Sequence, residues 1–211
     1  MTSAESGDAD PDTSVDETEN GADATTEDAE FAVVLDHLPH GQPDDDRPRY
    51  KKSPLAYALG ERDFRLFELR LGDESDISIG DRVVVFPSEE RDAVEELREV
   101  EYDDLSNTAL SELEYVVEDI VEENERRFVD FYNDAQPITL RLHQLNLLPG
   151  IGKKLRNNIL DERKRGPYES FEDLEDRVSG LHHPRDVLVE RIMEELRDDD
   201  LKYKTFVGRD T

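Results

Sequence analysis

Apolar and polar positions follow the pattern of β-strands over residues 31–88. The run 31–36 (FAVVLD) is short and apolar, 64–71 (FRLFELRL) alternates with a period of two, and 82–87 (RVVVFP) is again apolar. Alternation of this kind places every second side chain on the buried face of a strand. Glycine and proline residues between these runs indicate tight turns. Several strands in so short a segment predict a small closed barrel of the OB-like type.

From residue 89 to residue 135 the apolar positions change to the spacing of a helix. One face collects the apolar side chains, and the opposite face is rich in glutamate. The apolar face consists of Leu110, Leu113, Val116, Val117, Ile120, Val121 and Phe128. We therefore expect acidic helices that connect the barrel to the rest of the chain, and we assign no chemistry to them.

The segment 145–163 (LNLLPGIGKKLRNNILDER) predicts two helices joined by a tight hairpin. Proline cannot continue a helix, so the first helix ends before Pro149 and the second begins at Lys153. Gly150 and Gly152 allow positive φ and a close approach of the backbone to a ligand, while Ile151 points into the core. The first N–H groups of a helix have no intrahelical partner and attract anions. The hairpin is therefore predicted to hold a phosphate.

Two kinds of group are expected to contact this phosphate. Backbone N–H groups are expected from Gly150, Ile151, Gly152 and Lys153, and positive side chains from Lys153, Lys154 and Arg156. Arg156 stands where many helix–hairpin–helix motifs carry a small or apolar residue. Either the second helix is rotated so that Leu155 fills the core, or Arg156 reaches over the hairpin toward the phosphate.

A second, degenerate copy of the motif follows the first. Residues 171–178 predict a short helix, 180–184 (GLHHP) a turn, and 185–197 a further helix. The second turn has one glycine where the first has two, so we expect it to pack against the first hairpin as a pseudo-twofold partner without binding phosphate equally well. The ending 201–207 (LKYKTFV) is either a final strand or an extended strap. Residues 136–211 thus predict an all-α helix–hairpin–helix domain.

The charge of the chain sets the background for these motifs. The net charge is −29, with 28 Asp, 27 Glu, 19 Arg and 7 Lys. An acidic, lysine-poor surface stays hydrated in concentrated salt, so we interpret the composition as halophilic adaptation. Residues 1–30 contain eleven acids and no Lys or Arg. Such a segment cannot bury enough apolar surface to fold, and we expect a disordered acidic tail.

Two segments are locally positive against this background. Residues 141–170 and residues 47–70 each carry seven Lys/Arg and three acids, a net charge of +4. The first segment contains the hairpin, and the second contains a basic cluster in the connection after the first strand, made of Arg47, Arg49, Tyr50, Lys51 and Lys52. Tyr50 is expected either to stack on a base or to pack on the barrel rim. Two positive patches in so acidic a chain favour an anionic partner.

Residue usage disfavours several other classes of protein. The chain has no cysteine, so it has no disulfide or thiolate metal site, and no apolar run approaches the roughly 20 residues that span a membrane. The N-terminus lacks a secretory signal, and we expect a cytoplasmic protein. The adjacent His182 and His183 diverge and lack the spacing of a zinc site, so we expect no metal and no cofactor. Asp173 and Asp176 lie on the polar face of a short predicted helix, and without a nucleophile motif or a Walker loop we expect no enzymatic activity.

Longer stretches of the chain resemble the archaeal family known as domain of unknown function 655. The similarity covers about residues 31–207 and rests on FAVVLDHLP (31–39), NERRFVDFYN (124–133), RLHQLNLLPGIGKK (141–154), ERKRGPYESFEDL (162–174), ERIMEEL (190–196) and KYKTFV (202–207). Members of this family are described as predicted RNA-binding proteins. The resemblance implies an OB-like barrel followed by a helical domain with a helix–hairpin–helix element, while the family's biochemical role is not established.

The sequence thus favours a non-catalytic RNA-binding protein. Its barrel would contact single-stranded or loop regions, and its hairpin would hold a neighbouring backbone without reading bases. By family analogy, an RNA of translation or ribosome biogenesis is the first candidate. Two alternatives stay open, a DNA-binding module of repair or replication and a protein-docking adaptor with a purely structural hairpin. No membrane or small-molecule partner is expected, and the sequence leaves open the oligomeric state and the identity of the RNA.

Overall fold

The structure is a computed structural model that describes residues 29–42, 52–72 and 75–208. Most of the predicted acidic tail, residues 1–28, lies outside the described residues. Arg47, Arg49, Tyr50 and Lys51 of the predicted basic cluster also lie outside them. The structural description below therefore concerns the sheet, the helices and the hairpin.

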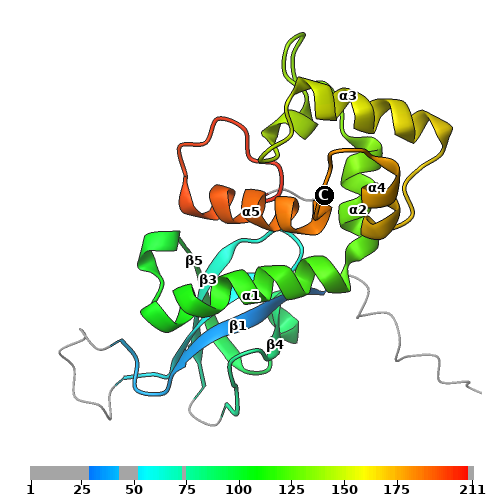
Figure 1. Ribbon diagram of the computed structural model, residues 1–211. Coiled ribbons are helices and arrows are strands. Elements are labelled where there is room, and N and C mark those ends of the chain that lie inside the picture. The colour runs from blue at the N-terminus through cyan, green and yellow to red at the C-terminus, as the bar shows by residue number, and fades with distance from the viewer. Residues whose placement is uncertain (1–28, 43–51, 73–74, 209–211) are drawn as a thin grey trace, which may run out of the picture.

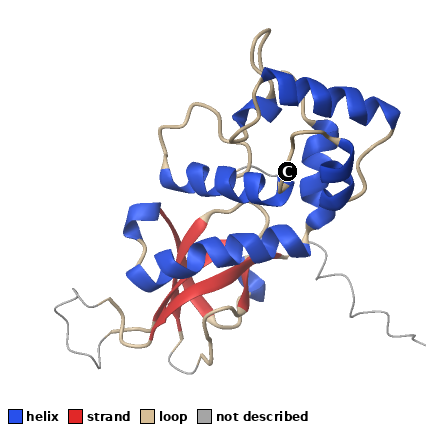
Figure 2. Cartoon of the chain, in the orientation of Figure 1, coloured by secondary structure: helices blue, strands red, loops and turns tan. Residues whose placement is uncertain are grey.

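The described strands form one antiparallel sheet that curls into a half-barrel, drawn in red in Figure 2. The strand order across the sheet is β4-β1-β2-β3-β5. The strands are β1 (Glu30–Leu38), β2 (Leu55–Gly60), β3 (Leu66–Leu71), β4 (Arg82–Phe86) and β5 (Val94–Val100). The runs predicted at 31–36, 64–71 and 82–87 are therefore confirmed as strands. β2 (LAYAL followed by glycine) is nearly all buried and does not alternate, and for that reason its sequence did not stand out as a strand.

Both faces of the curled sheet are buried. A β-bulge between Val34 and Asp36 shifts the register of β1 against β2, and bulges increase the bend and twist of a sheet. Val34 packs inside the curl, whereas Leu35 packs under the helices. The inner core consists of Ala32, Val34, Ala56, Ala58, Phe67, Leu69, Leu71, Ile77, Val85 and Val94. The sheet therefore contributes to two cores, one within its own curve and one shared with the helical part.

The helices cover one face of the sheet and then extend away from it (Figure 1). The α-helices are α1 (Asn107–Glu123), α2 (Glu125–Asp134), α3 (Lys153–Glu162), α4 (Phe171–Arg177) and α5 (Pro184–Arg197). Short 3-10 helices are η2 (Ser88–Glu90), η3 (Tyr102–Asp104), η4 (Gln144–Leu147) and η5 (Arg163–Arg165). No helix in the described part of the chain is long and apolar enough to cross a membrane.

α1 joins the sheet to the other helices. Its N-cap Ser106 accepts a hydrogen bond from the N–H of Ala109 and donates its hydroxyl to the buried carboxylate of Asp36 in β1, at 2.5 Å. Its buried face includes five of the predicted positions, while the predicted Leu110 is only partly buried and Phe128 lies on α2; α5 packs against α1. One continuous core contains Leu35 and Leu59 of the sheet together with Ile159 and Leu188 of the helical part. The division into a barrel domain and a helical domain stays a prediction, since the described halves share this core.

The C-terminal segment is an extended strap, one of the two predicted alternatives. It is held by Glu195, a fully buried side chain on α5. The Glu195 carboxylate accepts the backbone N–H groups of Thr205, Phe206 and Val207 at 2.7–3.1 Å and the guanidinium Nε of Arg191 at 2.9 Å. A buried carboxylate needs such partners, because an unpaired charge in the core is strongly destabilising.

The prediction of helices throughout 89–135 is wrong at its start, where β5 occupies 94–100. Apolar residues recur there at Val94, Leu97 and Val100, a spacing of three that resembles a helix. In the structure Leu69 pairs with Leu97 but Leu71 pairs with Val94, so β5 has one extra residue, a bulge, between these two pairs. The bulge lets the side chains of Val94 and Leu97 both enter the inner core. Val100 lies on the opposite face, in the core shared with the helices. A bulged edge strand thus accounts for the helix-like spacing.

Candidate nucleic-acid interface

The predicted hairpin forms a tight turn between η4 and α3. The segment before it is a single 3-10 turn, not the α-helix that the sequence suggested. Gly150 has φ of +73°, a conformation that favours glycine, and the buried Ile151 donates its N–H to the carbonyl of Leu148 at 3.2 Å. Gly152 is the N-cap of α3 and is extended, with φ of −77° and ψ of 177°. Ile151 therefore anchors the turn to the core as predicted, while only the first glycine needs positive φ.

The outer surface of the hairpin is open. A Cβ atom added at Gly150 or at Gly152 would meet no heavy atom within 4 Å among the described residues. Gly152 has a backbone conformation that any residue can adopt, and no internal contact demands its small size. A side chain at Gly152 would therefore hinder only another molecule that approaches the hairpin. The geometry is that of a surface to which another backbone can come close.

The N–H groups available to a ligand differ from those predicted. Ile151 and Gly152 donate inside the hairpin, to Leu148 O and to Gly150 O at 3.1 Å, so they are not free for a phosphate. The first backbone bond of α3 is donated by Arg156 to Gly152 O, and no side chain caps the helix. The N–H groups of Lys153, Lys154 and Leu155 consequently lack intrahelical partners. The receptor for an anion thus keeps Lys153 of the predicted donors and adds Lys154 and Leu155, while donation by Gly150 stays a prediction.

Arg156 braces the hairpin from behind. Leu155 packs against the shared core, which is the first of the two predicted arrangements. Arg156 Nη1 donates to Asn146 Oδ1 at 3.0 Å, and Asn146 Nδ2 donates to the carbonyl of Ile151 at 2.9 Å. These bonds connect the first turn of α3 to η4 across the hairpin. A direct phosphate contact by Arg156 stays a prediction.

The lysines of the hairpin differ from most other cations of the chain in having no carboxylate beside them. In the described part of the chain, Arg141, Lys153, Lys154 and Lys202 are exposed and form no ion pair, and of these Lys202 lies over the ring of Tyr203. Carboxylates lie within ion-pair distance of Arg62, Arg65, Arg70, Arg82, Arg98, Arg126, Lys164, Arg165, Arg177, Arg185, Arg191, Arg197 and Lys204. The hairpin thus presents unneutralised positive charge on a protein whose net charge is −29.

His143 lies beneath this region and is buried. Its Nδ1 accepts the N–H of Leu145 and so caps η4. Burial lowers the pKa of His143, and the nearby Arg163 and Arg156 lower it further. The neutral imidazole fits its role as a hydrogen-bond acceptor. Arg163 in turn donates to the carbonyls of Tyr132, Asn133 and Ala135, which closes the C-terminal end of α2.

The second hairpin repeats the turn of the first. Gly180 has φ of +93°, and the buried Leu181 donates its N–H to Val178 O at 3.1 Å, as Ile151 does to Leu148. Asn158 Nδ2 of α3 donates to Ser179 O at 3.3 Å, so the second turn contacts α3, while the pseudo-twofold packing of the two hairpins stays a prediction. α5, however, begins with Pro184, which has no N–H to offer. The start of α5 therefore has fewer N–H donors than that of α3, and weaker phosphate binding by the second turn stays a prediction.

Lys52 lies apart from the hairpin, beside the sheet. Its Nζ donates to the carbonyl of Gln42 at 3.2 Å, and both residues line a cavity with Glu68, Arg70 and Arg98. The structure describes no contact between Lys52 and the residues of the hairpin. The predicted barrel patch and the predicted hairpin patch are therefore separate surfaces as far as the described residues show.

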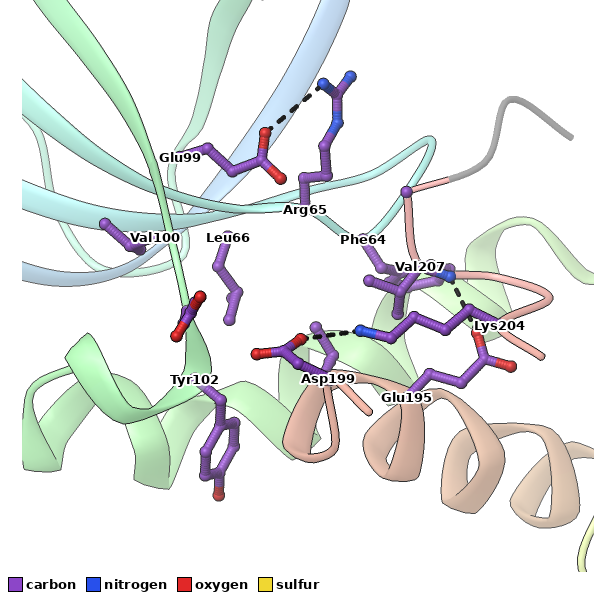
Figure 3. Close-up of a pocket in the computed structure, with 13 residues that line it drawn as sticks. Phe64, Arg65, Leu66, Glu99, Val100, Tyr102, Glu195, Asp199, Lys204 and Val207 are labelled. Atoms are coloured by element: carbon purple, nitrogen blue, oxygen red, sulfur yellow. Dashed lines mark hydrogen bonds and ion pairs between the residues drawn. The ribbon is translucent and has the colours of Figure 1, made fainter. Parts of the chain in front are cut away.

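A cavity of about 460 Å³ lies between the sheet and the C-terminal strap (Figure 3). Leu66, Val100 and Tyr102 form part of its wall. Several of its charged groups already have partners: Lys204 Nζ lies 2.8 Å from Asp199 Oδ1, and the Glu195 carboxylate accepts backbone N–H groups of the strap. The described residues contain no group of three or more side chains placed to hold a metal ion. Four acids (Glu99, Glu101, Glu195 and Asp199) and two bases (Arg65 and Lys204) line this cavity, so its lining is acidic, in contrast to the basic hairpin.

Comparison with known proteins places the chain in a family. A protein-family model described as "Protein of unknown function (DUF655)" matches residues 28–208. The uncharacterized protein MJ0038 of Methanocaldococcus jannaschii is 42% identical over 179 residues, which cover 84% of this chain and 79% of that protein. The crystal structure of Af1531 from Archaeoglobus fulgidus, a DUF655 structure, is 43% identical with a TM-score of 0.77, covering 85% of this chain and 99% of that one. With its hairpin, curled sheet and strap all inside the matched range, the chain belongs to the DUF655 family of proteins of unknown function.

Proposed function

We propose that this protein is a non-catalytic RNA-binding protein that holds a phosphate backbone at its LPGIGKK hairpin. The N–H groups of Lys153, Lys154 and Leu155 would donate hydrogen bonds to the phosphate oxygens, and the two lysine side chains would supply charge. Gly150 and Gly152 keep the surface open for the approach of the backbone. The curled sheet would act as an OB-like barrel that contacts single-stranded or loop regions.

The observation that carries the proposal is the absence of carboxylate partners at the hairpin. Elsewhere in the described chain most basic side chains are neutralised by a nearby acid, as expected when acids outnumber bases about two to one. Lys153, Lys154 and Arg141 stay unpaired at one end of the molecule. Clustered cations that no acid neutralises favour an external anion. Their combination with free N–H donors and an open glycine surface fits a phosphate.

The same geometry would serve a DNA-binding module, and a protein-docking adaptor would use the hairpin only as a turn. RNA is preferred because the family resemblance points there, and an RNA of translation or ribosome biogenesis in the cytoplasm of a halophile is the first candidate. In concentrated salt, counterion release contributes little to affinity. Directional N–H bonds should then dominate, and we expect the affinity to fall only weakly as KCl is raised.

The test is a binding titration of the full chain by fluorescence anisotropy against a structured RNA and a DNA duplex of matched length. The titration is repeated over a series of KCl concentrations with the wild type and with Lys153→Glu/Lys154→Glu. Both side chains are exposed and unpaired, so the double variant should fold normally by circular dichroism. RNA binding that the double variant loses supports the proposal. Preference for the duplex DNA supports the DNA module instead, and binding that is unaffected by the double variant refutes the hairpin as the site.

A further inference from the structure

A second structural feature, beside the hairpin, bears on which RNA is bound. Residues 137–143 form a projecting loop, closed at its base by an antiparallel bridge between Pro137 and His143. The N–H groups of Ile138 and Thr139 both donate to the carbonyl of Leu142, at 2.8 and 3.0 Å. This projecting loop has its own hydrogen-bonded frame and a defined tip.

The tip is held by a side chain. Thr139 Oγ1 accepts the N–H of Arg141 at 3.2 Å and the N–H of Leu142 at 3.0 Å. A threonine hydroxyl that accepts the N–H groups of the second and third residues after it stabilises a turn known as an ST-motif. The residue enclosed by these bonds is Leu140, whose position on the loop is therefore set by the backbone.

Leu140 is the most exposed large apolar side chain described, with a relative accessibility of 107%, against 66% for Tyr115 and 46% for Ile79. Nothing in the described part of the chain covers it. Single exposed apolar residues are common on proteins, so exposure alone assigns no role. Here, however, an apolar side chain is displayed in full on a braced loop, and the next residue is the exposed and unpaired Arg141.

The projecting loop is tied to the hairpin through η4. His143 at the base of the loop accepts the N–H of Leu145, and its carbonyl accepts the N–H of Asn146 at 2.8 Å. Asn146 in turn donates to Ile151 O inside the hairpin. In Figure 1 the loop projects at the top of the view, past α3 and away from the sheet. The loop and the hairpin thus form one hydrogen-bonded surface at this end of the molecule.

We propose that Leu140 is an apolar wedge that packs on the face of an unstacked base beside the backbone held by the hairpin. This inference rests on the proposed RNA-binding function and adds the substrate class, an RNA stem interrupted by a bulged or junction nucleotide. Leucine has no donor or acceptor, so it reads no base edge and contacts only a base face. In a continuous stem that face is already stacked, whereas at a bulge it is free. Arg141 would contact the phosphate of the same nucleotide.

The experiment compares two RNA stem-loops that are identical except for one bulged 2-aminopurine nucleotide. Anisotropy gives the dissociation constant for each RNA, and the 2-aminopurine emission reports whether the bulged base is contacted. The proteins are the full-length wild type, Leu140→Ala, Lys153→Glu/Lys154→Glu and the matched control Ile79→Ala. Ile79 is an exposed apolar residue on the sheet side, and both alanine variants remove little internal packing.

The wild type is expected to prefer the bulged RNA and to change its 2-aminopurine emission. Leu140→Ala should reduce that preference about tenfold and remove the emission change, since the apolar contact is lost. Ile79→Ala should keep both, and the double lysine variant should weaken binding to both RNAs.

Three results would overturn the inference in distinguishable ways. If the wild type binds RNA through the hairpin lysines but Leu140→Ala keeps the full preference, the wedge is wrong and the proposed function stands. If the wild type binds neither RNA, the proposed function falls together with the wedge. A bulge preference seen only with the corresponding DNA stem would overturn the assignment to RNA.

Discussion

The substitution Gly152→Ser distinguishes between two roles of the hairpin, a purely structural turn and a phosphate-binding site. Gly152 is the N-cap of α3, has extended φ and ψ, and makes no side-chain cap. Serine is a better N-cap than glycine by a few tenths of a kcal/mol, because its hydroxyl accepts an N–H of the first helical turn. Replacing glycine where the conformation is compatible adds about 0.4–1 kcal/mol through the unfolded state. The variant should therefore be more stable by about 1 kcal/mol, or roughly 2–4 °C in melting temperature.

The same hydroxyl would occupy an N–H group that we assign to the phosphate. In the serine variant the N–H of Lys154 or Leu155 is bonded internally and is lost to the ligand. A hydrogen bond to a charged group contributes about 1.5–3 kcal/mol, so RNA affinity should fall by about one to two orders of magnitude. We expect stability and affinity to change in opposite directions. Urea unfolding and anisotropy in the same KCl buffer measure the two quantities.

Two control variants isolate the cause. Gly152→Ala adds a Cβ but no hydroxyl, so its N–H groups stay free and its affinity should lie between those of the wild type and the serine variant. Gly150→Ala forces a side chain into φ of +73° and should lose about 1–2 kcal/mol of stability. If Gly152→Ser is stabilised and binds RNA as tightly as the wild type, the first turn of α3 is not the phosphate receptor and our reasoning is refuted.

Three further outcomes are expected. Thr139→Val removes the acceptor for two N–H groups of the projecting loop. The variant should reduce the preference for bulged RNA severalfold with little change in the melting temperature. An unchanged preference would mean that these hydrogen bonds are not needed to position Leu140. Glu195→Gln removes the buried carboxylate that pairs with Arg191, which then keeps only its pair with the exposed Glu194, and should cost about 3–5 kcal/mol by urea unfolding; a loss below 1 kcal/mol would contradict the role of this carboxylate. Burial raises the pKa of Tyr168 to about 12, above the value of about 10 in an unfolded chain, so the stability from its neutral hydroxyl is complete below pH 10 and is lost as pH rises to 12. Titration of tyrosine absorbance with parallel unfolding curves would detect this, and a Tyr168 that ionises near pH 10 in the folded state would exclude it.

The sequence predicted those parts of the fold in which the local pattern and the tertiary environment agree. β1, β3 and β4 have alternating or compact apolar runs, and α1 has one clear apolar face. β5 was missed because a bulge shifts its inward positions to a spacing of three. The position of a bulge depends on the partner strand, which local periodicity does not contain. The hairpin was found because proline, glycine and the following lysines specify a turn and a helix start through local rules.

The candidate site was predicted in its residues but not in its hydrogen bonds. The sequence does not show that Ile151 and Gly152 use their N–H groups inside the hairpin, since this depends on the exact turn. Nor does it show which cations are neutralised, because partners such as Arg185 and Glu122 are 63 residues apart. Leu140 carries no local signal either, since its exposure follows from the frame that Thr139 and Leu142 build around it. The lack of ion pairs at Lys153 and Lys154 can be recognised only in the folded structure.

The core shared by the sheet and the helical part has a consequence for the entropy of binding. Two modules joined by a flexible linker lose relative rotational and translational freedom when one ligand engages both. Here Leu35 and Leu59 of the sheet pack in the same core as Ile159 and Leu188, and Asp36 of β1 bonds the N-cap of α1. That freedom was already lost when the chain folded. A ligand long enough to reach from the hairpin to the sheet would therefore meet both surfaces at a fixed separation and with no further ordering of the protein between them.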